Sequence, residues 1–435
     1  MNLTKGGFDW WLAGLCLSRT GGTLVFLSYA AAIPVLQKEW SMSAAAAGSI
    51  SSGFHLCYGL SLVVLSSLAD RTGPKRVYLG SLGMGAALSL AFAFWAGDYL
   101  SGLILYSLVG LALGGTYTTG LMLLADHYPA HRRGRAIGFF IASSSLGYAL
   151  SLIISGLALP RGGYGLAFLL TGLGPLVATL LAGLTLARTK VVPRARSGAQ
   201  RFTKEVLRNK PAVTLIAGYT CHAFELLGMW AWTPAFLTLC LVGSGLDGSE
   251  AIGWGPYLTA FFHLTGLLAS FTMGMLSDRA GRARVMFHLS LISTTASFVF
   301  GWTIGWPLVL IVALGAVYAF SGIGDSPVLS TALTETVDPA FLGSAFGIRS
   351  ILGFGAGALA PLAFGAVLDR TNPGAASGAH QTWGWAYGVL GLAGLGAVIM
   401  AHRFGRLEKD RLEKDRLEKN RLGKARAAGR ERSSP

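Results

Sequence analysis

Long apolar stretches alternate with short polar segments along most of the chain, and each stretch is about twenty residues long or longer. An α-helix of roughly 20 apolar residues crosses the hydrocarbon layer of a membrane, which is about 30 Å thick. The pattern therefore predicts twelve membrane-spanning helices. They cover residues 10–36, 44–68, 77–97, 99–124, 135–158, 164–187, 212–240, 251–276, 285–305, 307–332, 341–367 and 382–402.

The predicted spans fall into two groups of six, separated by a polar segment with eight basic residues. We therefore expect an all-α membrane protein built from two pseudo-symmetric six-helix bundles. The expected divisions are a first bundle at 1–187, a linker at 188–211, a second bundle at 212–402 and a basic tail at 403–435. The tail repeats the unit Arg-Leu-Glu-Lys-Asp, which favours a solvated single helix because opposite charges recur four residues apart.

Composition indicates the same class, because 52% of the residues are hydrophobic, only 13% are charged and the mean hydropathy is +0.55. A soluble domain has about 25% charged residues. The 60 glycines suit a membrane bundle, in which small residues let helices approach closely. The cysteines, Cys16, Cys57, Cys221 and Cys240, lie in apolar stretches without a metal-ligand spacing, so we expect neither a metal site nor a cofactor.

Basic residues are distributed unequally between the two sides of the predicted bundle. Of the 35 Lys and Arg residues, 30 fall on the side that carries the linker and both termini, three fall on the opposite side and two lie within spans. The positive-inside rule then places the linker and both termini in the cytoplasm, and the protein in the cytoplasmic (inner) membrane. The net charge of +15 fits this topology and attraction to anionic membrane lipid, so no nucleic-acid partner is expected.

Two segments of the first half recur in the second half in register. Residues 66–76 (SSLADRTGPKR) match residues 274–284 (GMLSDRAGRAR) at an offset of 208. Residues 134–138 (GRAIG) match residues 343–347 (GSAFG) at an offset of 209. Two independent matches with nearly equal offsets indicate an internal duplication. Paired six-helix repeats that meet around a site at the middle of the bilayer are one architecture of secondary transporters.

The Asp-Arg-x-Gly order in both copies resembles the hallmark motif of the major facilitator superfamily, Gly-x-Leu-Ala-Asp-Arg-x-Gly-Arg-Lys. The resemblance in layout covers residues 9 to 402 and implies transport by alternating access. A carboxylate at a helix end, a basic cluster and a turn glycine would form a breakable latch between moving helices. An ordinary basic loop would explain the arginines but not the shared order. The expected latch residues are Asp70, Arg71, Gly73 and Arg76 in the first copy and Asp278, Arg279 and Gly281 in the second.

Five ionisable side chains lie deep inside the predicted spans, where each costs roughly 2.5 to 3.5 kcal/mol on insertion scales. The helical rise of 1.5 Å per residue places them at depths of about 10 to 20 Å. Groups at such depth need a partner or a function. The five are Arg19, His222, Glu225, Asp325 and Arg349.

In the family that the chain resembles, the first, seventh and tenth spans line the central cavity and the eleventh flanks it. The resemblance thus implies that the five groups face one chamber. Two guanidinium groups at mid-depth favour a small anion, because arginine stays charged and binds carboxylate or phosphate bidentately. We assign substrate binding to Arg19 and Arg349, with Tyr29 and Trp230 shaping the pocket. The alternative is that the arginines form structural ion pairs with the two buried carboxylates, which would leave the substrate neutral.

Coupling to protons requires a group whose protonation changes as its surroundings alternate between wet and closed. His222 and Glu225 lie three residues apart on one helix face and, together with Asp325, are assigned to proton coupling. His55 and His263 also lie within spans, where a packing role is the simpler interpretation.

These features predict a monomeric secondary active transporter that moves a small organic or inorganic anion with proton coupling, as a symporter or an antiporter. Residues 143–147 (SSSLG) lack the Gly-Pro-x-x-Gly-Gly pattern of drug–proton antiporters, which disfavours drug export of that kind. The alternatives are a transporter of a neutral or cationic molecule, including an exporter, and a transporter-derived sensor or assembly factor without flux. No nucleotide-binding loop or signature of covalent catalysis is present, so an enzyme is not expected.

Overall fold

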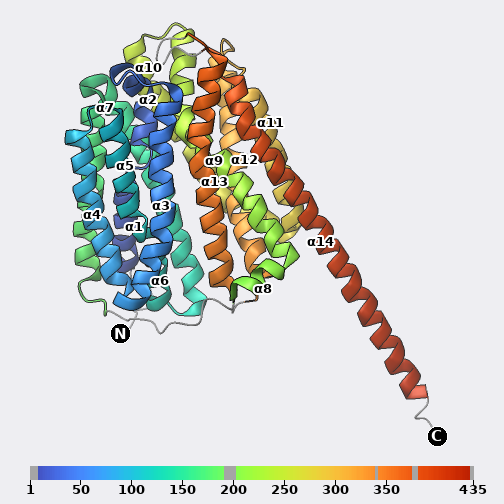
Figure 1. Cartoon of the computed structure of the whole chain (residues 1–435). Coiled ribbons are helices and arrows are strands. Elements are labelled where there is room, and N and C mark those ends of the chain that lie inside the picture. The colour runs from blue at the N-terminus through green and yellow to red at the C-terminus, as the bar shows by residue number, and fades with distance from the viewer. Residues whose placement is uncertain (1–7, 191–201, 339–340, 375–380, 432–435) are drawn as a thin grey trace.

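The computed structural model describes residues 8–190, 202–338, 341–374 and 381–431, and the elements that it contains are α-helices. Figure 1 shows them side by side in two groups, with the first half of the chain in blue to green and the second half in yellow-green (α8 and α9) through orange to red. The all-helical architecture predicted from the apolar stretches is confirmed. Part of the expected linker (191–201) and the end of the expected tail (432–435) lie outside the described residues.

The first half contains a break that the hydropathy pattern did not predict. Its elements are α1 (Trp10–Gly22), α2 (Ser28–Glu39), α3 (Ala44–Thr72), α4 (Pro74–Trp95), α5 (Tyr99–Leu113), α6 (Gly115–His127) and α7 (Ala130–Leu186). The expected span 10–36 is divided between α1 and α2, where the amide of Thr23 donates to both Arg19 and Thr20 and the chain continues in turns. Glycine favours a helix less than alanine by about 1 kcal/mol, and Gly21 and Gly22 directly precede this break.

The long element α7 contains two of the expected spans. Gly162 and Gly163 leave helical geometry, and Gly163 has a φ of 62°, which glycine adopts without strain. On either side of this bend, Gly147 and Gly174 approach the same stretch of the first span, next to Thr23 and Gly21 respectively. The two arms of α7 therefore run back along each other as a hairpin.

The second half follows the predicted spans closely. Its elements are α8 (Phe202–Arg208), α9 (Lys210–Gly243), α10 (Gly248–Ala280), α11 (Arg282–Phe300), α12 (Leu308–Thr336), α13 (Leu342–Thr371) and α14 (Gly384–Glu431). The short α8 lies within the expected linker. The last helix continues beyond the bundle into the tail and projects away from it (Figure 1).

The described chain crosses the bundle twelve times. Ten of its helices are long and apolar enough to span a membrane. The bent α7 is one of these ten and contributes two passes, and α1 together with α2 adds one more pass. The number of passes therefore agrees with the twelve apolar stretches.

The repeated segments have the same backbone in both halves. Gly73, between α3 and α4, has φ 92° and ψ 139°, and Gly281, between α10 and α11, has φ 89° and ψ 139°. Both turns lie at the end of the bundle where α1 begins and α9 begins. We call this end the basic face, and the opposite end, with the loops at 40–43, 96–98, 244–247 and 301–307, the far face.

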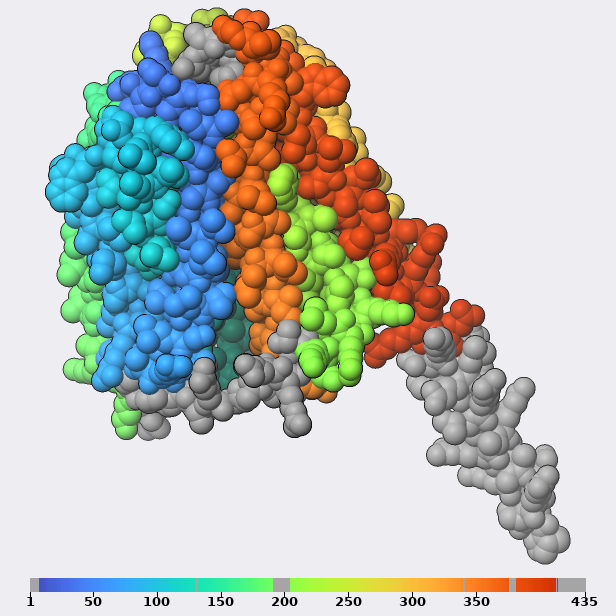
Figure 2. Space-filling view, viewed as in Figure 1, coloured from blue at the N-terminus to red at the C-terminus, as the bar shows by residue number. Residues whose placement is uncertain are grey.

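The two halves are in close contact toward the far face. A Cβ atom on Gly48 of α3 would lie 2.2 Å from the carbonyl oxygen of Pro361 on α13, so only glycine permits this approach. Nearer the far face, the carboxylate of Asp369 on α13 accepts hydrogen bonds from the amides of Ala44 and Ala45 at the start of α3, both at 2.8 Å. Figure 2 shows α3 (blue) against α13 (orange) along the upper seam, with deeper atoms visible between them near the lower edge.

Candidate solute-binding and coupling site

Arg19 is buried in the last turn of α1, with 3% of its surface exposed. Its Nε donates to Ser144 Oγ at 2.7 Å and its Nη1 donates to Thr116 Oγ1 at 2.8 Å. The guanidinium also faces the rings of Tyr117 and Phe140, at 5.2 and 5.6 Å from their centroids. Among the described residues, no carboxylate forms an ion pair with Arg19. The described groups that meet its positive charge are hydroxyl groups, aromatic faces and the negative end of the α1 dipole.

Arg349 is the second cation, on α13 in the other half. Its guanidinium carbon lies 3.6 Å from the centroid of the Tyr219 ring on α9 and 5.4 Å from that of Phe346. Its Nε atom is buried and has no hydrogen-bond partner among the described residues, although the residue as a whole is partly exposed. An unpartnered N–H of a permanent cation is a ready donor for a ligand oxygen.

Tyrosine side chains lie between the two arginines. Tyr117 on α6 interacts electrostatically with both Arg19 and Arg349, and Tyr148 on α7 interacts with Arg19, Tyr117 and Tyr219. The three tyrosines are partly exposed although they lie far from the ends of the bundle. We call these five residues the central cluster. The central cluster joins the two halves. Its partly exposed groups lie on the basic-face side of the contact between α3 and α13.

The sequence analysis named the two arginines of the central cluster but not Tyr148 or Tyr219. A signal for Tyr219 exists in the sequence. Pro34 and Pro234 occupy matching places in the first and seventh spans, 200 residues apart, and the same offset relates Arg19 to Tyr219.

His222 and Asp325 lie next to the central cluster. Nδ1 of His222 is 3.8 Å from Oδ2 of Asp325, and Nε2 of His222 is 2.7 Å from Ser326 Oγ. Both side chains are almost fully buried, and Oδ1 of Asp325 has no hydrogen-bond partner. The charge of Arg349 acts on His222. The structure thus brings these two coupling candidates to the edge of the proposed binding residues.

Glu225 points into the interior of the second half instead. Its Oε1 lies 2.7 Å from Ser297 Oγ and its Oε2 lies 3.3 Å from Ser293 Oγ, both on α11. The hydroxyl of Ser297 is also 2.5 Å from that of Tyr318 on α12. Glu225 and Asp325 interact electrostatically within the second half. Sequence spacing alone placed Glu225 on the face of His222 and did not reveal its contacts with α11.

The neutral ion-pair arrangement considered from the sequence is not seen in the described part of the chain. Arg19 and Arg349 form no ion pair with Glu225 or Asp325, and the buried carboxylate with an ionic neighbour is Asp325, next to His222. The same residues contain no group of three or more His, Cys, Asp and Glu side chains that could hold a metal ion.

Trp230 and Tyr29 occupy different surroundings. The ring of Trp230 on α9 lies 5.3 Å from that of Tyr148 and 5.2 Å from that of His263, and its Nε1 is buried without a partner. Trp230 therefore adjoins the central cluster at the seam. Tyr29 is fully buried inside the first half, where its hydroxyl donates to the carbonyl of Ala47 at 3.0 Å.

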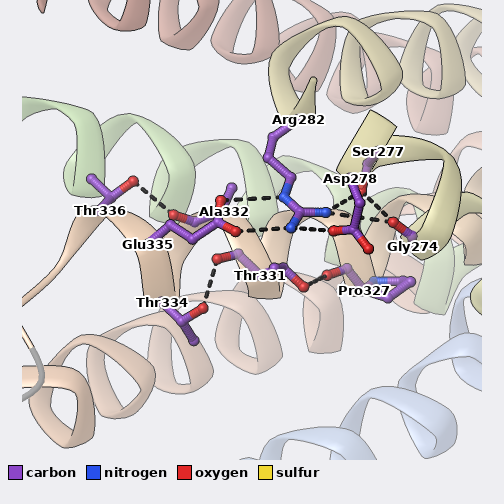
Figure 3. A network of polar contacts seen from close by, with 10 residues as sticks. All are labelled: Gly274, Ser277, Asp278, Arg282, Pro327, Thr331, Ala332, Thr334, Glu335 and Thr336. Carbon is purple, nitrogen blue, oxygen red and sulfur yellow. Dashed lines mark hydrogen bonds and ion pairs between the residues drawn. The ribbon is translucent and has the colours of Figure 1, made fainter. Parts of the chain in front are cut away.

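The second copy of the repeated motif forms a polar network around Arg282 (Figure 3). Nη2 of Arg282 is 2.5 Å from Oδ1 of Asp278 and 2.8 Å from Oε1 of Glu335, and its Nη1 donates to Ser277 at 2.5 Å. The Nε and Nη2 atoms of Arg282 donate to the two carboxylate oxygens of Glu335 at 3.2 and 2.8 Å. The network ties the ends of α10 and α12 to the start of α11. Arg282 was not predicted as a latch residue, because the first copy of the motif has Pro74 at that position.

The first copy is arranged differently. Among the described residues, no ion pair involves Asp70, Arg71 or Arg76. The two arginines are exposed, as is Arg279 in the second copy. Lys75 instead donates to two carbonyl oxygens just after α7, at 3.0 and 3.2 Å.

Comparisons with known proteins place these features in a family. The family model of the Major Facilitator Superfamily matches residues 12–247 and 241–434. The putative niacin/nicotinamide transporter NiaP of Bacillus subtilis is 25% identical over 352 residues, covering 78% of this chain and 83% of the relative. The 4-hydroxybenzoate transporter PcaK of Pseudomonas aeruginosa is 25% identical over 365 residues, covering 77% and 78%. A solved bacterial homologue of the human lysosomal transporter Spinster, inward-facing and occupied, is similar with a TM-score of 0.70 at 18% identity, covering 93% of this chain and 98% of that chain.

Proposed function

The chain belongs to the Major Facilitator Superfamily, and we propose that it carries a small organic anion, specifically an aromatic carboxylate, across the cytoplasmic membrane with proton coupling. Members of this family are secondary transporters of small solutes and not enzymes. We base the charge of the solute on the central cluster and its shape on the aromatic rings around it.

The proposal rests on two guanidinium charges that have no carboxylate partner in the part of the chain that the structure describes. Burying a charge is costly unless another charge or several hydrogen bonds compensate it. Arg349 retains an unpartnered Nε, and Arg19 is held by neutral hydroxyl groups. A carboxylate between them would supply the missing negative charge and accept charge-assisted hydrogen bonds from both halves.

The surroundings of the two arginines favour a planar anion. The rings of Tyr117, Tyr148 and Tyr219 lie between or against them, and aromatic rings stack well on flat ligands. The two relatives above are named as transporters of niacin or nicotinamide and of 4-hydroxybenzoate. These names support an aromatic acid as the transported solute. The two guanidinium groups of the central cluster favour its ionised form, the carboxylate.

Alternating access gives the contacts at the seam their role. The halves are joined near the far face, and the exposed members of the central cluster lie on the basic-face side of that contact. Because 30 of 35 basic residues belong to the basic face and its tail, we assign this face to the cytoplasm. In this assignment the structure represents the inward-facing state.

Proton coupling is assigned to Asp325, His222 and Glu225. Buried carboxylates change protonation when solvent access and neighbouring charge change. His222 is paired with Asp325, and the charge of Arg349 acts on His222. Binding of an anion at Arg349 therefore alters the charge seen by the His222–Asp325 pair, which links solute and proton.

Flux into proteoliposomes tests the proposal. An inward pH gradient, acid outside, should drive accumulation of labelled 4-hydroxybenzoate, and Arg349→Gln should lower kcat/KM by about 10- to 100-fold, as expected for a lost charge-assisted contact. Arg161→Gln, which removes an exposed arginine near the far face, is the matched control and should transport normally. Binding without flux would indicate a sensor, and equal transport of the neutral 4-hydroxybenzamide would indicate a neutral cargo.

A further inference from the structure

Two small pockets lie inside the second half, on opposite sides of Glu225. The outer pocket is nearer the far face, between α9, α10, α11 and α12, and its lining includes Trp230, His263 and Tyr318. The inner pocket is nearer the basic face, between α9, α11, α12 and α14, and its lining includes Thr214 and Asp325. Neither pocket is lined by the two arginines of the central cluster.

A chain of hydroxyl groups connects the outer pocket with Glu225. Tyr318 lines the pocket, its hydroxyl lies 2.5 Å from that of Ser297, and Ser297 Oγ lies 2.7 Å from Glu225 Oε1. A serine hydroxyl has a single proton. The Ser297 hydroxyl is placed to donate either to Tyr318 or to Glu225, and its single proton serves one of them at a time. In the arrangement in which Ser297 donates to the carboxylate, Tyr318 donates to Ser297, and the protons of the chain then point toward Glu225.

Asp325 connects Glu225 with the inner pocket. The two carboxylates interact electrostatically, and Asp325 lines the pocket with an Oδ1 atom that has no hydrogen-bond partner. A buried acceptor of this kind is satisfied by water when the space beside it is polar. Thr214 supplies a second polar group to that space. Between Glu225 and Asp325 themselves, the described residues show no hydrogen bond, so the connection is interrupted there.

Among the described residues, no Lys, Arg or His side chain forms an ion pair with Glu225. Its own helix contributes His222, which is directed to α12, and α12 contributes Tyr318 and Asp325. The groups from α11 are the serine hydroxyls, and α14 contributes Gly394, where an added Cβ would lie 2.8 Å from Oε2. Other titratable groups on the packed helices include Tyr387 of α14, which interacts electrostatically with Tyr318, and Cys221 of α9. His263 lies at the outer pocket, and Arg349 acts on His222.

We infer that protons cross the second half by a route of their own, from the outer pocket through Tyr318, Ser297, Glu225 and Asp325 to the inner pocket. The route of the solute and the route of the proton then meet only at His222. This coupling rests on the proposed function, in which the chain transports an anion.

The transfer balances at every step. The Tyr318 oxygen takes a proton from hydronium in the outer pocket, which leaves water, while its own proton passes to Ser297 and that of Ser297 passes to the Glu225 carboxylate. Glu225 next gives this proton to the Asp325 carboxylate, which releases it to water in the inner pocket. The gap between the two carboxylates prevents a continuous leak of protons. Binding of the anion changes the His222–Asp325 pair, and this change lets the proton pass from Glu225 to Asp325.

Exchange and accumulation separate the proton route from the solute site. Exchange of labelled for unlabelled 4-hydroxybenzoate across proteoliposomes needs no proton release, because the loaded carrier returns loaded, whereas accumulation driven by a pH gradient does. Ser297→Ala and Tyr318→Phe should lower accumulation at least tenfold and leave exchange within twofold of wild type. Ser290→Ala is the matched control, since Ser290 is a buried serine of α11 that bonds to the carbonyl of Met286. It should leave both activities unchanged.

The outcomes are distinct. Wild-type accumulation in Ser297→Ala and Tyr318→Phe overturns the route, and so does equal loss of exchange and accumulation, which would make these residues part of the solute site or of the packing. Ser297→Thr retains a hydroxyl and should restore accumulation.

A second readout does not need the anion. After a pH jump, the infrared band of the protonated Glu225 carboxyl, identified by its absence in Glu225→Gln, should rise at least tenfold more slowly in Ser297→Ala and Tyr318→Phe than in wild type. Equal rates overturn the route. Failure of the wild type to exchange 4-hydroxybenzoate refutes the proposed cargo, while the infrared result still decides the route.

Discussion

Arg349 holds its guanidinium carbon 3.6 Å from the centroid of the Tyr219 ring, on the neighbouring helix of the same half. The first half contains the same pairing with the helices exchanged, because Arg19 of α1 lies 5.6 Å from the centroid of Phe140 on α7. Phe140 and Arg349 are 209 residues apart, which is the offset of the repeated segments. Each half therefore contributes one cation and one ring, and a solute that contacts both cations must touch both halves.

The stacked ring should orient Arg349 for the anion. Tyr219→Leu removes a cation–π contact worth about 0.5 to 2 kcal/mol, so we expect the Kd for 4-hydroxybenzoate to rise about 2- to 30-fold. Tyr219→Phe keeps the ring and should bind nearly as well as wild type. Equilibrium binding to the purified protein checks both values, and an equal loss in the two variants would show that the hydroxyl, and not the ring, is what matters.

Asp369 should hold the far face closed. Its carboxylate accepts two hydrogen bonds from Ala44 and Ala45 across the seam, at the positive end of the α3 dipole. Asp369→Asn weakens this contact, so the population with an open far face should rise. Spin labels at the exposed positions Tyr99 and Glu250, one in each half near the far face, should report longer distances in the variant.

The matched control for that experiment is Asp247→Asn. Asp247 is also at the far face and caps the start of its own helix, α10, through the amide of Ser249 at 2.8 Å. That contact lies within one half, so its loss should not change the distance between the labels. Equal shifts in the two variants would mean that the change at the seam is nonspecific.

The Arg282 network should stabilise the basic face of the second half. Glu335→Gln removes its bidentate partner, and because Glu335 is half-exposed we expect a loss of about 1 kcal/mol and an apparent Tm lower by about 1 °C. Glu205→Gln, which removes an exposed pair with Arg208, is the control and should leave the melting temperature unchanged. A lower melting temperature in the control alone would contradict the role of the network.

The number of passes and the equivalence of the two halves could be predicted from the sequence, because both depend on patterns that repeat over many residues. The turns at Gly73 and Gly281 are an example, since the repeated motif carries glycine where the backbone needs a positive φ. The break after Gly22 could not be predicted from hydropathy. It depends on a few residues of low helix propensity inside a stretch that is apolar throughout.

The directions of individual side chains were harder to predict. In a membrane bundle, both the lipid and the interior are apolar, so hydropathy does not mark the inward face of a helix. Tyr29 therefore looked equivalent to Trp230, although the structure buries it against the backbone of α3. The partners of Arg282 and Glu225 likewise come from distant helices, which no local spacing reveals.

The selectivity between an acid and its amide tests the central claim most directly. 4-Hydroxybenzoate and 4-hydroxybenzamide have nearly the same shape and differ in charge, so their binding ratio measures what the two guanidinium groups contribute. We predict that wild-type protein binds the acid about 100-fold more tightly, a difference of roughly 2.7 kcal/mol, and that Arg19→Gln with Arg349→Gln reduces the ratio below about tenfold. Equal binding of acid and amide by the wild type, or a ratio that the double substitution leaves unchanged, would contradict an anion site at the central cluster.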